Sequence, residues 1–205
     1  MIDKKAVLES ITKGIVEIRL HGRGGQGVVV ASKMLSKGFF KEGYVAQTFP
    51  KYGVERRGAP AAAFVRVAKE EGRGLIGIRS EIYEPDHIIV LDPTLITAIN
   101  VTQGLKKNGW VIINAPPDRA NFGDRLKDYR VAVVDASHIA VEHKLGSAQA
   151  PVVNSAILGG FAKVYQAPAI GAVIDAIKEE APVKPQENAD AAAVAYQQIV
   201  VLGGE

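Results

Sequence analysis

Residues 15–20, with the sequence IVEIRL, alternate between two faces, and this two-residue period predicts a β-strand. From Val28 onward the apolar residues recur at helical spacing until Gly43 interrupts the run, which predicts an α-helix. The segment between strand and helix, 22–27, reads GRGGQG. A strand, a glycine-rich turn and a helix in this order are the typical opening unit of an α/β domain.

The same two periods continue along the rest of the chain. We expect further strands at residues 44–48, 61–68, 75–79, 87–91, 110–114 and 131–135, and helices at residues 3–11, 92–103, 139–144, 154–165, 169–180 and 188–201. The strands at 110–114 and 131–135 have the continuous apolar pattern of buried parallel strands. The chain therefore predicts one Rossmann-like α/β domain, 1–205, with a mostly parallel sheet flanked by helices and a helical C-terminal end.

Composition is that of a soluble globular protein, because 47% of the 205 residues are hydrophobic and 23% are charged. The chain contains no cysteine. This excludes a disulfide, a thiolate nucleophile, a cysteine-ligated zinc and a cysteine-held iron–sulfur cluster on this chain. Any cluster chemistry must therefore belong to a partner.

The sequence shows no targeting or membrane segment. Its first residues mix both charge signs and have no apolar core of signal-peptide length. No apolar stretch approaches the roughly 20 residues that cross a bilayer. We therefore expect a cytoplasmic protein with no membrane partner.

The net charge of +3 is too small to require nucleic acid, but the charge is unevenly distributed. Between Arg23 and Arg79, eleven Lys and Arg stand against four acids. Such a basic stretch beside a glycine turn favours an anionic small molecule or an acidic partner. A solvated basic face is the alternative. The six Phe and six Tyr form no stacking cluster, so a nucleic-acid module has little support.

The glycine turn satisfies the G-x-G-x-x-G pattern with Gly22, Gly24 and Gly27. Glycines let the backbone approach a phosphate, and the free N–H groups of the following helix attract anions. A dinucleotide site also requires an acid at the end of the next strand, which here ends in Gln47-Thr48-Phe49-Pro50. NAD and FAD are therefore disfavoured, and a purely structural turn remains an alternative.

A second candidate wall is the loop FPKYGVERRGAP at 49–60, which has charge and turn residues but no periodicity. Arginine forks match phosphate and carboxylate oxygens in a bidentate way. The loop residues that could serve an anion site are Lys51, Tyr52, Gly53, Glu55, Arg56, Arg57 and Gly58. A solvated salt-bridge cluster is the alternative interpretation.

No catalytic or metal-binding group is predicted on this chain. His138 and His143 are five residues apart, off one helical face, and no HExxH motif occurs among the four histidines. A G-x-S-x-G nucleophile motif is also absent. Asp86, Asp92 and Asp135 lie at strand boundaries, where helix capping is the expected role.

Three segments carry a resemblance to a known family. HGRGGQGVVVASKML at 21–35, FPKYGVERRGAPAAAFVRV at 49–67 and VVNSAILGGFAKV at 152–164 resemble, in this order, the gamma subunit of 2-oxoacid:ferredoxin oxidoreductases. IRSEIYEPDHIIVLDPTL at 78–95 looks most like the pyruvate branch of that family, the pyruvate synthases.

The resemblance implies a cytoplasmic multi-subunit enzyme that converts a 2-oxoacid and coenzyme A to acyl-CoA and carbon dioxide and reduces ferredoxin. It places thiamine diphosphate and [4Fe-4S] clusters on the alpha, beta and delta partner subunits and associates the gamma chain with coenzyme A. The residues that match the motifs, and so would bind coenzyme A, are Gly22, Arg23, Gly24, Gly25, Gln26, Gly27, Tyr52, Gly53, Glu55, Arg56, Arg57, Gly58 and Asn154.

Two alternatives stay open at this point. The chain could serve another 2-oxoacid, such as 2-oxoglutarate, 2-oxoisovalerate, indolepyruvate or oxalate, because substrate selectivity should lie around thiamine diphosphate on other chains. It could also be a free-standing nucleotide-binding oxidoreductase domain, although the missing ribose acid argues against this.

Overall fold

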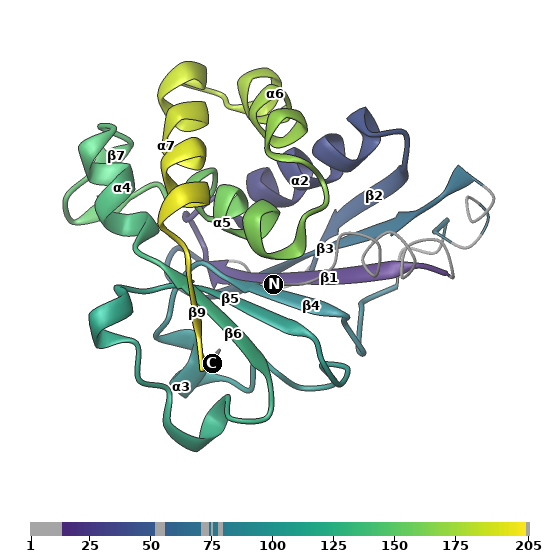
Figure 1. The fold of residues 1–205 in the computed structure, drawn as a ribbon, viewed down its shortest axis with the longest axis horizontal. Coiled ribbons are helices and arrows are strands. Elements are labelled where there is room, and N and C mark those ends of the chain that lie inside the picture. The colour runs from purple at the N-terminus through teal and green to yellow at the C-terminus, as the bar shows by residue number, and fades with distance from the viewer. Residues whose placement is uncertain (1–13, 52–55, 71–73, 75, 78–79, 204–205) are drawn as a thin grey trace.

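The computed structural model describes residues 14–51, 56–70, 74, 76–77 and 80–203. A seven-stranded sheet with the order β2-β3-β1-β4-β5-β6-β9 forms the centre of the molecule (Figure 1). Its strands are β1 (Val16–Arg23), β2 (Val45–Pro50), β3 (Pro60–Ala68), β4 (His87–Val90), β5 (Trp110–Asn114), β6 (Arg130–Val134) and β9 (Val200–Leu202). Two short strands, β7 (Gly146–Ser147) and β8 (Ala150–Pro151), form a separate hairpin.

The central strands β1, β4, β5 and β6 run parallel to one another. Antiparallel strands complete both edges, since β3 pairs antiparallel with β1 and β2, and β9 pairs antiparallel with β6. Strands β4 and β5 are almost entirely buried, in agreement with their continuous apolar sequences. The predicted Rossmann-like sheet, parallel at its centre and flanked by helices, is confirmed.

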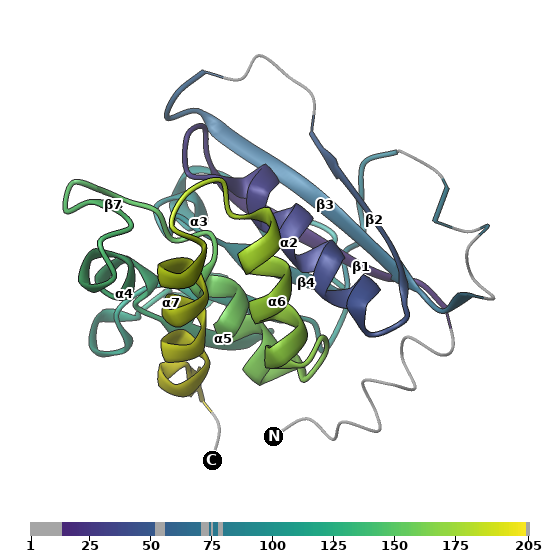
Figure 2. The same cartoon turned by 90° about the horizontal axis from the view of Figure 1, so that it is seen from above.

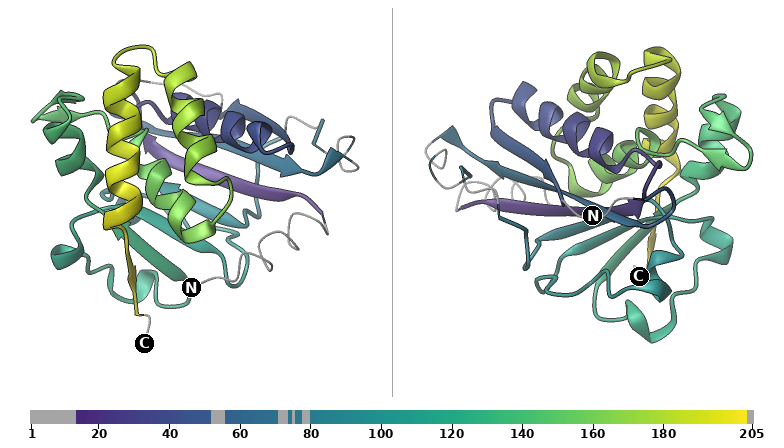
Figure 3. Two further views of the ribbon diagram at one scale, coloured as in Figure 1. Left: turned by 45° about the horizontal axis from the view of Figure 1, so that its top comes forward. Right: turned by 180° about the vertical axis from the view of Figure 1, so that it is seen from behind.

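Four helices cover one face of the sheet. They are α2 (Val28–Lys41), α5 (Ala156–Tyr165), α6 (Ile170–Glu180) and α7 (Pro185–Gln198). Figures 2 and 3 show α6 lying beside both α2 and α7. The predicted apolar stripe of α2 is buried against the sheet residues Ile18 and Leu20 in one core cluster. The predicted helical C-terminal end therefore packs as a second layer on the sheet.

The opposite face of β4, β5 and β6 has a thinner cover. It consists of the short helix α3 (Leu95–Ala98), the 3₁₀ turns Pro117–Arg119 and Gly123–Arg125, and connecting segments. Leu95 and Leu126 pack there against Ile88 and Ile113 in a second core cluster. A further helix, α4 (Ala136–Glu142), follows β6. Its N-cap is Asp135, whose carboxylate accepts a hydrogen bond from His138 N, as expected for that aspartate.

The structure corrects two predicted helices. The helix expected at 92–103 is only α3, because Ile99 is extended and turns follow it. The helix expected at 188–201 begins at Pro185 and ends at Gln198. The β-branched Val200 and Val201 then pair with β6. Residues 76–77 of the strand expected at 75–79 lie in a turn; the rest of that strand and the helix expected at 3–11 lie outside the described residues.

Candidate functional site

The predicted glycine turn connects the end of β1 to the start of α2. Gly25 and Gly27 have φ values of 95° and 76°, in the left-handed region that glycine adopts without strain. Gly27 is the N-cap of α2, and no side chain caps the helix there. Because the first N–H groups of an α-helix lack partners within the helix, the turn presents hydrogen-bond donors and the positive end of the helix dipole.

Gly24 places this turn against the second predicted wall, the loop before β3. Gly24 N donates a hydrogen bond to Ala59 O at 2.9 Å, and Gly58 N donates to Gly24 O at 3.0 Å. A Cβ at Gly24 would collide with the Arg56 carbonyl oxygen, so glycine is required for this approach. The structure therefore brings the segments 22–27 and 56–58 into direct backbone contact.

Side chains of the turn converge on Asp92, which follows β4. Gln26 Nε2 donates to Asp92 Oδ2 at 2.9 Å, and Arg23 Nε donates to the same oxygen at 3.2 Å. Thr94 donates to Asp92 Oδ1 from its backbone N–H and from its hydroxyl. Partial burial alone would raise the Asp92 pKa, but these hydrogen bonds and the Arg23 charge outweigh burial and lower it. Asp92 is thus a fixed carboxylate that positions the turn.

The arginines of the two walls have different surroundings. Arg23 is used within the protein, because it also donates to Gly58 O at 3.0 Å and to Thr94 Oγ1 at 2.8 Å. Arg56 and Arg57 are both exposed, and only Arg57 lines the cavity described below. Among the described residues, the structure gives the Arg57 side chain no hydrogen-bond or ion-pair partner.

Asn154, just before α5, lies close to Gly27 at the α2 N-terminus. It is 5% exposed, and a Cβ at Gly27 would approach its Nδ2 to 2.6 Å. Its Oδ1 is buried without a hydrogen-bond partner in the described part of the chain, a condition that usually signals a missing partner. The third predicted segment therefore adjoins the glycine turn.

A cavity of about 360 Å³ opens where these elements meet. Its walls are residues 23–26, 57–58, 91–93 and 149–153, together with Asn114 and Ser137. The cavity lies at the carboxyl ends of β1, β4 and β5. From there β1 continues into α2 on the helical face, whereas β4 continues into α3 on the opposite face (Figure 1). Ligands of open α/β sheets bind at such a topological switch point.

Of the residues predicted for this site, Tyr52, Gly53 and Glu55 lie outside the described residues. The others fall into three groups that the structure brings together: the turn 22–27, the loop residues 56–58, and Asn154. Whether they bind a cofactor stays a prediction. Lys51, also named from the loop, belongs to a different cavity on the sheet.

Sequence reasoning missed three polar residues of the cavity wall: Asp92, Asn114 and Ser137. Asn114 Nδ2 donates to Leu91 O and to Ser137 Oγ, at 2.9 Å each. Ser137 N donates in return to Asn114 Oδ1 at 3.1 Å. A signal was present, because Asn114 ends a buried strand and Asp92 follows one, and such carboxyl ends form the binding edge of a parallel sheet.

No group of three or more potential metal-ligating His, Asp or Glu side chains occurs among the residues that the structure describes. Within the same residues, none of the helices combines the length and the apolar character that a membrane span needs.

Fold and site together define a Rossmann-like α/β protein with a cationic, glycine-lined cavity at the switch point of its sheet. The model of the pyruvate ferredoxin/flavodoxin oxidoreductase family matches residues 17–198. The chain is also 44% identical over 190 residues to the pyruvate/ketoisovalerate oxidoreductases common subunit gamma of Thermococcus kodakarensis, covering 91% of this chain and 98% of that one. This chain therefore belongs to the pyruvate ferredoxin/flavodoxin oxidoreductase family, and the predicted resemblance to its gamma subunits is confirmed.

Solved structures agree with the fold. The pyruvate oxidoreductase subunit PORC of Thermotoga maritima superposes with a TM-score of 0.73 at 29% identity, covering 92% of this chain and 99% of that one. A 2-oxoglutarate:ferredoxin oxidoreductase from Magnetococcus marinus, solved with 2-oxoglutarate, coenzyme A and succinyl-CoA, superposes with a TM-score of 0.65. At 15% identity, over 90% of this chain and 30% of that one, the second match shows a shared fold alone.

Proposed function

We propose that this chain is the gamma subunit of a cytoplasmic 2-oxoacid:ferredoxin oxidoreductase and that it contributes to coenzyme A binding. The complex converts pyruvate and coenzyme A to acetyl-CoA and carbon dioxide and passes the electrons to ferredoxin. The chain works as a single domain beside alpha, beta and delta subunits, which hold thiamine diphosphate and the [4Fe-4S] clusters. Family membership supports this assignment, and the absence of cysteine from this chain supports the placement of the clusters on other chains.

The observation that carries the coenzyme A assignment is the cavity at the switch point. Arg57 and the turn 23–26 line it, and the turn leads directly into the uncapped N-terminus of α2. Guanidinium groups and helix N-terminal N–H groups are the donors that phosphate oxygens prefer. Coenzyme A carries phosphates, so one of its phosphate groups is the ligand that this cavity suits.

The choice of 2-oxoacid rests on the relatives. The Thermotoga maritima protein is named for pyruvate, and the Thermococcus kodakarensis protein is named as a subunit common to pyruvate and ketoisovalerate oxidoreductases. We take pyruvate as the substrate of the complex. A branched 2-oxoacid is the second candidate, because the Thermococcus kodakarensis gamma subunit is named for ketoisovalerate as well as for pyruvate.

The test uses the assembled enzyme carrying Arg57→Ala. Loss of one charge-assisted hydrogen bond, worth about 1.5 to 3 kcal/mol, should raise the KM for coenzyme A about tenfold or more. Arg57→Lys should restore only part of the affinity, because an ammonium keeps the charge but loses the planar fork. The matched control is Arg119→Ala, which removes an arginine with an 82% exposed side chain on the 3₁₀ turn Pro117–Arg119.

Two rates separate the possible roles of Arg57. In Arg57→Ala, single-turnover reduction of the clusters by pyruvate without coenzyme A should stay normal. Steady-state turnover should instead become limited by the concentration of coenzyme A. An unchanged KM for coenzyme A would refute the cavity as its site. Loss of both rates, together with a smaller complex in gel filtration, would instead assign Arg57 to subunit assembly.

A further inference from the structure

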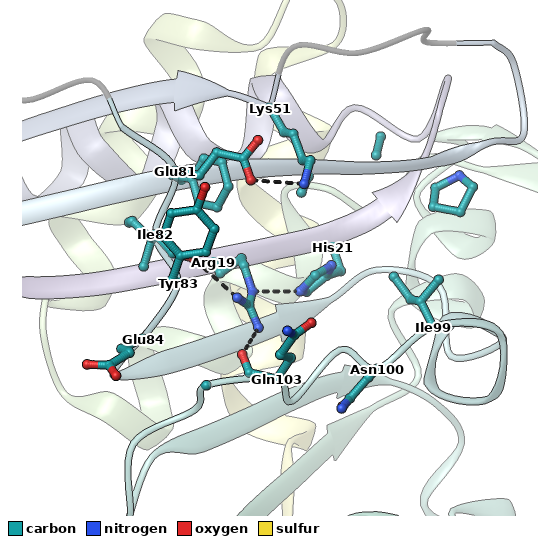
Figure 4. A pocket seen from close by; sticks show the side chains of 15 residues that line it. Arg19, His21, Lys51, Glu81, Ile82, Tyr83, Glu84, Ile99, Asn100 and Gln103 are labelled. Atoms are coloured by element: carbon teal, nitrogen blue, oxygen red, sulfur yellow. Dashed lines mark hydrogen bonds and ion pairs between the residues drawn. The ribbon is translucent and has the colours of Figure 1, made fainter.

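A second cavity, of about 510 Å³, lies on the face of the sheet opposite α2 (Figure 4). Along β1, Ile18 and Leu20 point to the helices, while Arg19 and His21 point into this cavity. None of its lining residues is shared with the cavity at the glycine turn. Its volume falls within the range of small-molecule sites, so the question is which ligand chemistry its walls suit.

The floor of the cavity is a buried guanidinium. Arg19 is 8% exposed and His21 is 7% exposed. Arg19 Nε donates to His21 Nε2 at 3.0 Å, Nη1 donates to Ile82 O at 3.2 Å, and Nη2 donates to Val101 O and Gln103 O at 2.9 and 2.7 Å. Three of these four acceptors are neutral backbone carbonyl oxygens, so the hydrogen bonds position the guanidinium without cancelling its charge.

The remaining acceptor, the His21 imidazole, is also neutral. Burial, the largest cause, and the charges of Arg19 and Lys51 together lower the His21 pKa to about 3. Because His21 Nε2 accepts the hydrogen bond from Arg19, the ring proton is on Nδ1. The cavity floor therefore carries the full positive charge of one arginine.

Neither carboxylate of the cavity wall pairs with Arg19. Glu81 is close enough to act on the Arg19 charge, but its Oε2 forms an ion pair of 2.9 Å with Lys51 Nζ. Glu84 is exposed, and its carboxylate points away from Arg19 (Figure 4). A buried cation is costly unless an anion accompanies it. Within the described residues, the Arg19 guanidinium has no such contact.

Apolar side chains form much of the remaining wall. Phe64, Ile82 and Ile99 line the cavity, and the Tyr83 ring, 72% exposed, stands at its mouth. From this combination we infer that the cavity binds a small organic anion, with a carboxylate or phosphate directed at Arg19 and Lys51 and an apolar body against Phe64 and Ile82. The site is separate from the proposed coenzyme A cavity.

The test is a titration of the folded full chain with benzoate and, separately, with phenyl phosphate, followed by the NMR signals of the His21 ring. The two probes have the same apolar body, so their relative affinities distinguish a carboxylate site from a phosphate site. Saturable shifts of His21 with either probe are expected. No saturable shift with either probe would overturn the inference.

Two variants at the rim give opposite expected effects. Lys51→Gln removes a positive charge and should weaken binding about twofold to fivefold, the range of a partly exposed ion pair. Glu81→Gln removes the competing carboxylate and should tighten binding by a similar factor. Arg119→Gln, a remote exposed arginine, is the control. If both rim variants change affinity in the same direction, charge does not govern the site and the inference fails.

A competition experiment with coenzyme A tests whether the two sites are separate. Coenzyme A should leave the benzoate titration unchanged, because the two cavities share no lining residue. Displacement of benzoate by coenzyme A would overturn the inference of a separate site and would extend the coenzyme A site to Arg19. This result is distinguishable from failure of the proposed function, which is judged by Arg57 in the other cavity.

Discussion

Gln26 Nε2 donates a hydrogen bond of 2.9 Å to Asp92 Oδ2, and this bond joins the turn after β1 to the segment after β4. Gln26 uses its other side-chain atom as well, since its Oε1 accepts from Arg23 N at 2.7 Å. The glutamine therefore holds the turn closed from inside while tying it to the neighbouring strand. The floor of the cavity depends on this pair, because β1 and β4 diverge into helices on opposite faces.

Replacement of Asp92 by Ala should loosen the turn. Gln26 and Arg23 would lose an acceptor for hydrogen bonds that are partly buried. We expect the free energy of unfolding of the full chain to fall by about 1 to 3 kcal/mol, measured by urea unfolding at pH 7. The KM for coenzyme A of the assembled enzyme should rise at the same time.

Asp118→Ala is the matched control for this variant. Its carboxylate is 76% exposed and lies 3.8 Å from Arg119 Nε, so its removal should change stability by less than about 0.5 kcal/mol. Equal effects of the two substitutions would show that Asp92 contributes no more than a surface charge.

Gly24→Ala should lower the stability of the chain, whereas Gly171→Ala should leave it unchanged or raise it. A Cβ at Gly24 collides with the Arg56 carbonyl oxygen, whereas a Cβ at Gly171 meets no atom within 4 Å. Gly171 lies in the first turn of α6, where Ala is preferred over Gly by roughly 0.5 to 1 kcal/mol. Thermal unfolding should therefore show a lower Tm for Gly24→Ala and an equal or higher Tm for Gly171→Ala.

The larger Gly24→Val substitution should also abolish normal use of coenzyme A, because it separates the turn from the loop at Arg56. A Gly24→Val enzyme that assembles and keeps its coenzyme A dependence would show that the contact between the two walls is dispensable for the ligand.

Much of the fold was predictable because its signals are local. The alternation at 15–20 and the helical stripe from Val28 each depend on neighbouring residues, and both elements lie where the sequence predicts them. The glycine turn was also predictable, since Gly25 and Gly27 adopt a backbone conformation that other residues rarely adopt. The final strand was not, because Val200 and Val201 become a strand only by pairing with β6.

The site was only partly predictable for the same physical reason. Arg56 and Arg57 are adjacent and identical in sequence terms, and only their placement shows that Arg57 lines the cavity. Asp92 has the sequence context of a helix cap, but its main partners come from a turn 66 residues away. Contacts between distant segments leave no periodic signal along the chain.

The purified chain should be colourless and inactive without its partners. It has no cysteine to hold an iron–sulfur cluster, and no group of metal ligands occurs in the described part of the chain. The measurements are the visible absorption spectrum and pyruvate-dependent dye reduction, with the assembled brown complex as the positive control. Cluster absorbance or pyruvate oxidation by the chain alone would contradict the proposed division of labour.

Stability should fall in mildly acidic solution because of two buried histidines. Burial, the largest cause, and nearby cations together lower the pKa of His21 and of His87 from 6.5 to about 3. The cations are Arg19 and Lys51 at His21, and Lys106 and Arg130 at His87. Below pH 6.5 the unfolded chain therefore takes up protons at these rings that the folded chain does not bind. The part of the free energy of unfolding that depends on these two neutral rings is fully present above pH 6.5 and is lost progressively as the pH falls toward 3.

The window from pH 6.5 to 5 isolates this effect, because most carboxyl groups titrate below it. Each buried histidine should contribute a slope that approaches about 1.4 kcal/mol per pH unit at the acidic end of the window. His21→Gln keeps an acceptor for Arg19 Nε but cannot be protonated, so it should remove about half of the slope in urea unfolding measured across the window.

His138→Gln, on an imidazole that is 66% exposed, controls for the substitution itself. If the free energy of unfolding of the wild-type chain is flat from pH 6.5 to 5, both rings accept protons in the folded state. If the slope is unchanged in His21→Gln, the pH dependence belongs to other groups.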